Sequence, residues 1–121
     1  MTTIIAPPAA WALLEAALRT RRPIHVSYHN RQRLICPHAL GHNHNRPIVL
    51  GYQTGGHTST GTLAADPTKR WRWLFVDEID QAVPADPTSH WQTADNYNPT
   101  HPFPHAVDEV TIAITSPTTA T

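Results

Sequence analysis

The hydrophobic positions near the N-terminus repeat with the period of an α-helix. Trp11, Leu14 and Leu18 stand three and four residues apart, which places them on one helical face. Two consecutive prolines precede this pattern and suit a first helical turn, and a third proline follows it. The sequence therefore predicts a helix over residues 9–20 that packs through these three side chains, with an N-terminal arm over residues 1–8.

From Ile24 onward the hydrophobic period changes to two residues. Ile24, Val26 and Tyr28 alternate with polar residues, a pattern typical of a half-buried strand. Comparable short runs predict strands over residues 24–28, 33–36, 47–53, 71–76 and 107–115. Pro37 is expected to end the second of these, because proline cannot donate to a β-ladder. One helix followed by about five short antiparallel strands predicts a mainly β (α+β) fold, a small open barrel.

The segments between these strands are rich in glycine, proline and polar residues. Residues 41–45 are expected to form a turn and residues 54–68 a loop. The barrel is expected within residues 24–80, followed by an irregular proline-rich segment over residues 81–106. Residues 116–121 are expected to be a disordered tail. The predicted sheet core consists of Val26, Tyr28, Leu34, Leu50, Trp73, Phe75, Ile79, Val110 and Ile112.

Length and composition narrow the class of protein. A chain of 121 residues forms one domain with a modest core. Its single cysteine, Cys36, cannot form an internal disulfide, so the chain needs no oxidising compartment. No apolar run approaches the roughly 20 residues that span a bilayer, and the N-terminus lacks the features of a signal peptide. We expect a cytoplasmic protein with no membrane partner.

The charges are separated along the chain. Residues 1–72 carry nine basic and two acidic side chains, a formal charge of +7. Residues 73–121 carry seven acidic and no basic side chains, a formal charge of −7. Eight of the nine basic residues are arginines, whose planar guanidinium matches phosphate and carboxylate groups. This asymmetry predicts an anionic partner for the first part, or an acidic second part that folds back to neutralise it.

Several sequence blocks together resemble a known family. A helix that ends in arginines is followed by I-H-V-S-Y, I-C-P-H-A-L-G, P-I-V-L-G-Y-Q-T-G-G and W-R-W-L-F-V-D-E-I. In this order they resemble a small stand-alone WYL-type domain, here over residues 9–115. The resemblance implies an Sm-like or SH3-like five-stranded barrel behind an N-terminal helix. It also implies sensing of nucleotide-like ligands or nucleic acid, as in the regulatory parts of bacterial transcription factors and defence proteins.

The chain departs from this family in three places. Ile48-Val49-Leu50 replaces the W-Y-L triplet that names the family, so two aromatic residues of the ligand face are missing. Glu78 stands where a basic residue is often found. We expect no winged-helix domain before the predicted helix. The resemblance therefore bears more directly on the fold than on the ligand.

Five residues are candidates for ligand binding, namely Arg33, His38, Tyr52, Gln53 and Arg72. The two arginines would contact phosphate through bidentate hydrogen bonds, and the tyrosine ring would stack on a base. Two alternatives stay open. Arg72 would instead form a structural ion pair with Asp77 or Asp80, and His38 would be a hydrogen-bonded histidine at the edge of the core. The glycine-rich loop after Tyr52 would form an anion-binding nest or only a linker.

The sequence contains no recognisable catalytic set. Nine histidines are present, but His42 and His44 lack the further ligands that a zinc site requires. No nucleophile–base pair or paired carboxylate stands out, so we expect no enzyme, no metal and no cofactor. The favoured function is a regulatory module that binds a nucleotide or single-stranded nucleic acid. The alternative is a protein-interaction or assembly module, which uses a barrel edge to bind a copy of itself or a larger protein.

Overall fold

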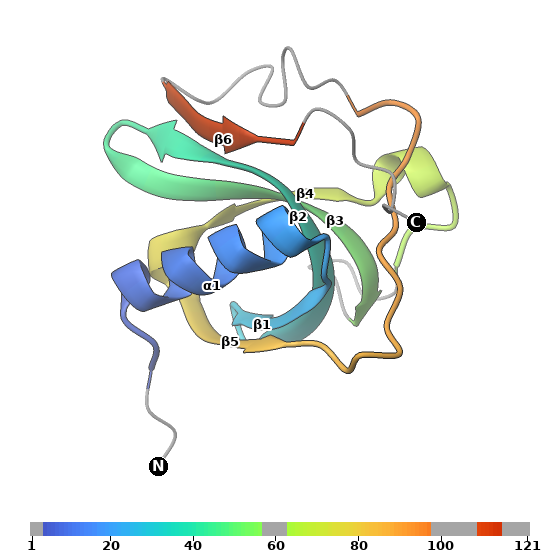
Figure 1. The fold of residues 1–121 in the computed structure, drawn as a ribbon, viewed down its shortest axis with the longest axis horizontal. Coiled ribbons are helices and arrows are strands. Elements are labelled where there is room, and N and C mark those ends of the chain that lie inside the picture. Colours follow the sequence, from blue (N-terminus) through green and yellow to red (C-terminus); the bar gives the residue numbers. More distant parts are fainter. Residues whose placement is uncertain (1–3, 57–62, 98–108, 115–121) are drawn as a thin grey trace.

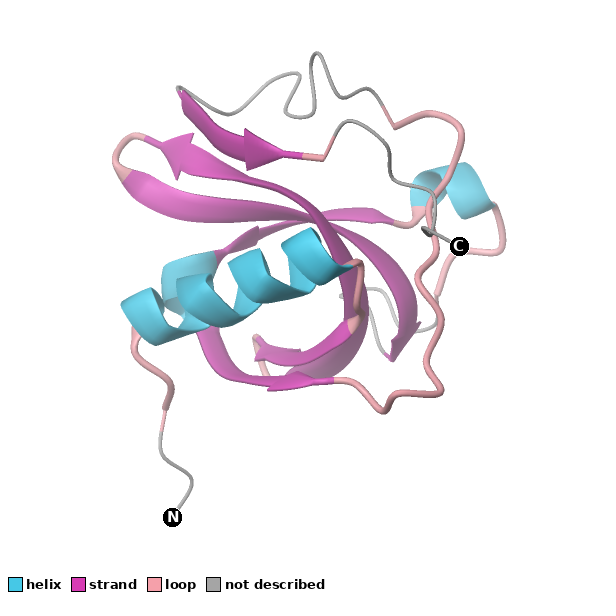
Figure 2. Ribbon diagram, in the orientation of Figure 1, coloured by secondary structure: helices cyan, strands magenta, loops and turns pink. Residues whose placement is uncertain are grey.

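The computed structural model describes residues 4–56, 63–97 and 109–114, which form one helix packed on a curved antiparallel sheet (Figures 1 and 2). The helix is α1 (Pro7–Thr20). The strands are β1 (Ile24–Tyr28), β2 (Arg31–Asn43), β3 (Arg46–Gly56), β4 (Trp71–Phe75), β5 (Ile79–Pro84) and β6 (Glu109–Ala113). Two short 3₁₀ helices, η1 (Pro67–Lys69) and η2 (Val76–Glu78), flank β4. The predicted mainly β fold, with an N-terminal helix before a small antiparallel barrel, is confirmed.

Strand β2 is the centre of the sheet. The strand order is β4-β3-β2-β1-β5, and β6 also pairs with β2. Along one edge β2 pairs with β3, whereas its other edge pairs first with β1 and then with β6. Figure 1 shows the result: β1 and β5 curl round at one end of the sheet, and β6 lies at the other. The two halves of β2 therefore belong to two different parts of the barrel wall.

Helix α1 covers the inside of the curved sheet, where it packs on β2 and β5. Leu14 and Leu18 are fully buried, and Trp11 is half-buried against the same core. The helix begins two residues before the predicted start and ends as predicted. Arg21 then adopts a left-handed conformation with a φ of 54°, and its backbone N–H caps the last turn. The helical periodicity thus identified both the element and the face that it buries.

Most of the predicted sheet core is buried. Val26, Tyr28, Leu50 and Ile79 are buried, whereas Leu34, Phe75 and Ile112 are half-buried. The prediction is wrong for Trp73 and Val110, which are 37% and 43% exposed.

Both errors have a structural cause. On β4, Leu74 faces the main core, so Trp73 lies on the opposite face of the strand. On that face Trp71 and Phe75 pack against a small second cluster formed by Ala39, Ile48 and Leu50, and Trp73 stays partly exposed. On β6, the pairing with β2 shifts by one residue between Leu40 and Gly41. This irregularity takes Val110 off the face that carries Ile112.

The predicted end of the second strand at Pro37 is wrong, because β2 continues through it to Asn43. Pro37 lies between the residues that pair with β1 and those that pair with β6, and beside a register shift against β3. A missing N–H costs little at such a place. The predicted turn over residues 41–45 shrinks to His44 and Asn45, which have left-handed φ values of 50° and 65°.

The segment after residue 80 is also more regular than predicted. The predicted irregular segment begins inside β5, whose residues up to Pro84 pair with β1. The predicted loop over residues 54–68 starts later, since β3 extends to Gly56, and its last two residues belong to η1. Of the predicted closing strand over residues 107–115, β6 contains Glu109–Ala113. Of the rest of the proline-rich segment, residues 85–97 are described and contain no further helix or strand, whereas residues 98–106 and the tail over residues 116–121 lie outside the described residues.

Within residues 4–56, 63–97 and 109–114, no helix has the length and the apolar character that crossing a membrane demands.

Candidate functional site

The hairpin between β1 and β2 directs an arginine into the barrel. His29 and Asn30 form its two-residue turn, with left-handed φ values of 49° and 62°, as the right-handed twist of the strands favours. This turn sets the register in which Val26 lies opposite Arg33. Directly opposed residues point to the same face of a sheet, and Val26 belongs to the main core. Arg33 therefore projects inward at the end of the barrel nearest the hairpin.

The guanidinium of Arg33 is buried and has no carboxylate partner among the described residues. The residue is only 5% exposed, and its guanidinium carbon lies 5.3 Å from the centroid of the Tyr28 ring. Its buried Nε has no hydrogen-bond partner among the described residues. Burial lowers the pKa of Arg33, and the positive charges of Arg72 and Arg31 lower it further. A buried guanidinium in this setting requires an anion or a set of acceptors to offset its lost hydration.

Arg72 reaches the same end of the barrel from β4. It lies opposite Gly51 of β3 and two residues before the buried Leu74, so it shares the inner face of the strand. One of its terminal nitrogens donates to the carbonyl oxygens of Lys69 and Trp71, at 3.0 and 2.8 Å. These carbonyls hold the half-buried side chain in place and leave its positive charge without a carboxylate in the described structure.

The end of β3 completes this group. Gln53 lies opposite Ile35 and is fully buried, and its amide nitrogen donates to the carbonyl oxygen of Gly55 at 3.0 Å. The next residue, Thr54, has a buried hydroxyl with no hydrogen-bond partner in the described part of the chain. Arg33, Arg72 and Gln53 thus come together at one end of the barrel, which we call the arginine end.

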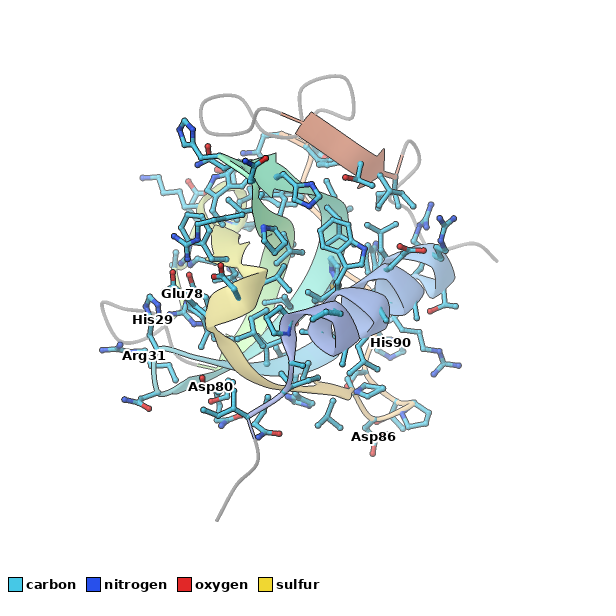
Figure 3. The ribbon with its side chains drawn as sticks, turned by 90° about the vertical axis from the view of Figure 1, so that its left-hand side faces the viewer. His29, Arg31, Glu78, Asp80, Asp86 and His90 are labelled. Atoms are coloured by element: carbon cyan, nitrogen blue, oxygen red, sulfur yellow. The ribbon has the colours of Figure 1, made fainter. Side chains whose placement is uncertain are left out.

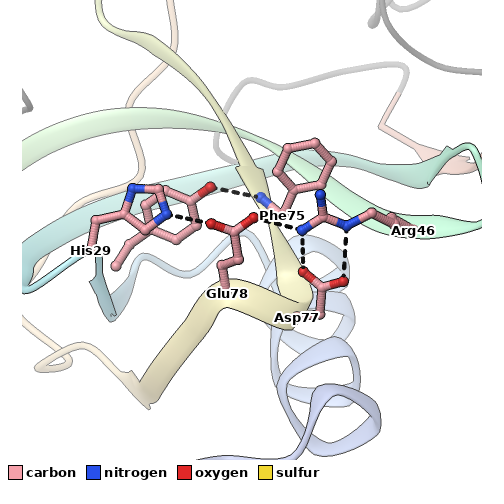
Figure 4. Close-up of polar contacts among 6 residues, drawn as sticks. His29, Arg46, Phe75, Asp77 and Glu78 are labelled. Atoms are coloured by element: carbon pink, nitrogen blue, oxygen red, sulfur yellow. Dashed lines mark hydrogen bonds and ion pairs between the residues drawn. The ribbon is translucent and has the colours of Figure 1, made fainter.

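Two acidic residues that follow β4, Asp77 and Glu78, are paired with a different arginine. Arg46 donates two hydrogen bonds to Asp77, at 2.7 and 3.1 Å, and one to Glu78 at 2.5 Å (Figure 4). His29 contacts the other oxygen of Glu78 at 2.5 Å, and Arg46 lies 3.8 Å from the centroid of the Phe75 ring. The acidic part of the chain therefore folds back onto the basic part here, but Asp77 binds Arg46 instead of Arg72.

His38 lies away from the arginine end, in a buried aromatic cluster. Its ring is fully buried, with the ring centroids of Trp71, Trp91 and Tyr97 at 4.7, 4.8 and 4.9 Å. Its Nδ1 donates to the carbonyl oxygen of Cys36 at 2.7 Å, and its Nε2 accepts from the Thr93 hydroxyl at 2.9 Å. Burial lowers the pKa of His38 to about 4. This geometry fits the alternative of a neutral histidine within the core.

Tyr52 belongs to the same aromatic cluster. It is 2% exposed, its hydroxyl donates to the carbonyl oxygen of Pro67 at 2.9 Å, and its ring packs edge-on against Trp71. A ring with so little exposure offers no face on which a base could stack. Of the five candidate residues, the structure therefore brings Arg33, Gln53 and Arg72 together and places His38 and Tyr52 elsewhere.

Two residues of the arginine end were not among the sequence candidates. Tyr28 provides the ring against which Arg33 packs, and Arg31 lies opposite Tyr28 across the hairpin. Figure 3 shows Arg31 beside His29 and Glu78 on one side of the molecule. The alternation of β2 could have identified Arg31, because residues two apart on a strand share a face.

The histidines and the cysteine of the described residues form neither a metal site nor a reactive thiol. Within the described residues, no three histidine, cysteine or acidic side chains are placed to hold a metal ion. Cys36 is buried, its sulfur accepts a hydrogen bond from the Gln92 N–H at 3.4 Å, and burial raises its pKa to about 11. A thiol with that pKa is a poor nucleophile at neutral pH.

Comparisons of the chain with protein-family models, curated proteins and solved structures find no match.

Proposed function

We propose that the arginine end binds a phosphorylated, nucleotide-like ligand or single-stranded nucleic acid, and that the chain acts as a regulatory module of the WYL type. One observation carries this proposal: the Arg33 guanidinium is buried without a carboxylate partner in the described structure. Arg72 adds a second positive charge close enough to lower the pKa of Arg33. A phosphate would relieve this repulsion and would accept bidentate hydrogen bonds from either guanidinium.

The pairing of the other arginines with carboxylates supports the same site. Arg46 is held by two carboxylates and Arg19 by Glu15 at 3.0 Å, so both have local structural roles. The side chains of Arg31, Arg33 and Arg72 contact no carboxylate in the described residues. Together with the resemblance to bacterial WYL-type regulators, this selective pairing favours an anionic ligand at the arginine end. Tyr52 and His38 are not part of the proposed site.

A binding titration tests the proposal. Short single-stranded DNA and RNA, mononucleotides and cyclic nucleotides are titrated against the wild type at low and moderate salt. The variants are Arg72→Gln and Arg33→Met, with Arg19→Gln as a control of equal charge change on the exposed face of α1. We expect at least tenfold weaker binding for the first two, since each hydrogen bond to a charged group is worth about 1.5–3 kcal/mol. If a polymer binds, its affinity falls steeply with salt.

Two outcomes would contradict the proposal. One is the absence of binding to any of these ligands at low salt. The other is binding that Arg19→Gln weakens as much as Arg72→Gln does, which would show only general attraction to a basic protein.

A protein-interaction module is the second candidate. Strand β4 lies at the end of the strand order and pairs only with β3 among the described strands, and Trp73 on it is 37% exposed. Such an edge can add a strand from another copy or another protein. Light scattering over a range of concentrations tests self-association. Trp73→Ser should abolish it, whereas Val83→Ser, on β5 and 56% exposed, should not.

A further inference from the structure

A surface cavity lies beside the end of α1 and the start of β1. Its volume is about 250 Å³, and it is lined by residues 20–23 and by the segment that follows β5. Pro23, Ala85 and Trp91 are buried apolar residues of its lining, and Ser89 brings a hydroxyl group to the wall. Figure 3 places Asp86 and His90, two further wall residues, on the opposite side of the molecule from Arg31.

The wall of this cavity is held by backbone hydrogen bonds. The N–H of Ala85 donates to the carbonyl oxygen of Pro23 at 3.1 Å, which joins the two sides. The N–H of Ser89 donates to the carbonyl oxygen of Asp86 at 2.8 Å and closes a turn. On the helix side, the N–H of Arg22 donates to Ala17 at 2.9 Å after the left-handed Arg21. These contacts give the cavity a defined shape before any ligand enters.

The charges around the cavity are unbalanced in favour of an anion. Arg21 and Arg22 stand in its wall. Arg21 donates to the carbonyl oxygen of Leu18 at 2.8 Å, and Arg22 makes no ion pair within the described residues. The one carboxylate in the wall, Asp86, already accepts two hydrogen bonds from Thr88, at 2.7 and 2.8 Å, which lower its pKa. Asp86 therefore stays ionised but makes no ion pair with Arg22 within the described residues, and its single negative charge stands against the two positive charges of Arg21 and Arg22.

We propose that this cavity is a binding site for a small oxyanion, either inorganic phosphate or the phosphate of a small monoester. Its volume equals that of about eight water molecules at about 30 Å³ each. It is smaller than the roughly 300–1,000 Å³ of sites for drug-sized ligands. The guanidinium of Arg22 and the hydroxyl of Ser89 donate to the phosphate oxygens. This proposal does not depend on the arginine end.

The test is a titration followed by amide chemical shifts of the full chain, with inorganic phosphate and phenyl phosphate as probes at constant ionic strength. We expect saturable shifts confined to residues 20–23 and 85–91. Arg22→Gln should weaken the affinity about tenfold, as the loss of a charged hydrogen-bond donor does. Asp86→Asn keeps an acceptor for Thr88 and removes a negative charge, so it should tighten binding. Arg19→Gln, outside the cavity, should change the affinity less than twofold.

The outcomes separate this site from the arginine end. Arg33→Met should leave these shifts unchanged. Tighter binding of phenyl phosphate than of inorganic phosphate would assign a monoester, and the reverse would assign the free anion. The absence of saturable shifts in these two segments would overturn the proposal. So would equal affinities for Arg22→Gln and Arg19→Gln, or weaker binding by Asp86→Asn.

Discussion

The His38 imidazole is neutral in the folded protein because burial lowers its pKa to about 4, from an ordinary value of 6.5. Protonation is therefore easier in the unfolded chain. The contribution of neutral His38 to stability is fully present above about pH 6.5 and is lost as the pH falls towards 4. The difference in pKa corresponds to about 3 kcal/mol of unfolding free energy.

Urea unfolding at a series of pH values checks this prediction. Wild type should lose stability between pH 6.5 and 4, before the carboxylates with lowered pKa, Asp77 and Glu78, begin to titrate. His38→Gln should be less stable at pH 7 but should show a much flatter profile. The exposed His25 provides the control, since His25→Gln should keep the wild-type slope. A wild-type slope in His38→Gln would contradict this account.

In contrast to the substitution of His38, a substitution of Arg33 is expected to stabilise the folded protein. Methionine has a similar length but no buried charge, and the Nε that it removes has no partner among the described residues. Leaving a buried polar group unsatisfied costs about 1–3 kcal/mol. Arg33→Met should therefore raise the free energy of unfolding by about 1 kcal/mol while it weakens anion binding at the arginine end at least tenfold. Chemical denaturation measures the first effect, and marked destabilisation would show that Arg33 has a structural role instead.

For single residues, the sequence indicated which side chains could bind an anion more readily than it indicated which of them lie together in the fold. Arg33 and Arg72 were identified by charge, and the structure places them together. His38 and Tyr52 were grouped with them because they stand in the same sequence blocks. Their separation depends on the fold of residues 91–97, which bring Trp91, Thr93 and Tyr97 to His38. No periodicity in that irregular segment predicts this contact.

Among the elements, β6 offers a test of how the last described residues are held. Ile114, just after the strand, is 4% exposed, and its N–H donates to the carbonyl oxygen of His38 at 3.0 Å. Tyr97 donates to its carbonyl oxygen at 2.7 Å. Ile114→Ala should cost about 2–5 kcal/mol of stability, as large-to-small changes in a core do.

Val110, in β6 itself, is the matched control. It is 43% exposed, and Val110→Ala should change stability by no more than about 0.5 kcal/mol. Thermal and urea melts of both variants make the comparison. Equal changes in stability for the two variants would mean that β6 contributes through its backbone pairing and not through the Ile114 side chain. Even in that case, removal of residues 105–121 should lower the melting temperature, because β2 loses its pairing with β6.

The elements also show where local sequence rules fail. Proline ends most strands, but Pro37 lies where β2 has exchanged one neighbour for another, so its missing N–H is tolerated. The β5 residues include Asp80, Gln81 and Pro84, and their strand is specified mainly by pairing with β1. Non-local pairing of this kind has no strong signal in the sequence of the strand itself.

For the whole molecule, the change from a helical to a strand period was enough to predict one helix followed by an antiparallel barrel. The order of the strands was not predicted, because it depends on which edges remain available once β2 has paired. The separation of charge was also informative. Its neutralisation is only partial, since Arg46 pairs with Asp77 and Glu78 while the arginine end contacts no carboxylate among the described residues.

Hydrogen exchange provides a test at this scale. The central strands β2 and β3 have neighbours on both sides, whereas β4 and β5 are the ends of the strand order. Amide protons in the middle of β2 and β3 should therefore exchange only through global unfolding. Those of β4 and β5 should exchange through smaller local openings. Equal protection in β4 and β2 would show that the sheet opens only as one unit, or that another chain covers the β4 edge.

Strand β2 restricts how the sequence of this protein can change in length. A single inserted or deleted residue within it would shift its register against β1, β3 and β6 together, and would turn every later side chain to the opposite face. Insertions in the connections between strands would leave these pairings intact. The interval of five residues from Arg33 to His38 should therefore be kept among descendants of a common ancestor, even where the residues around it diverge. The spacing of residues along β2 would then identify distant relatives more reliably than the identity of the residues.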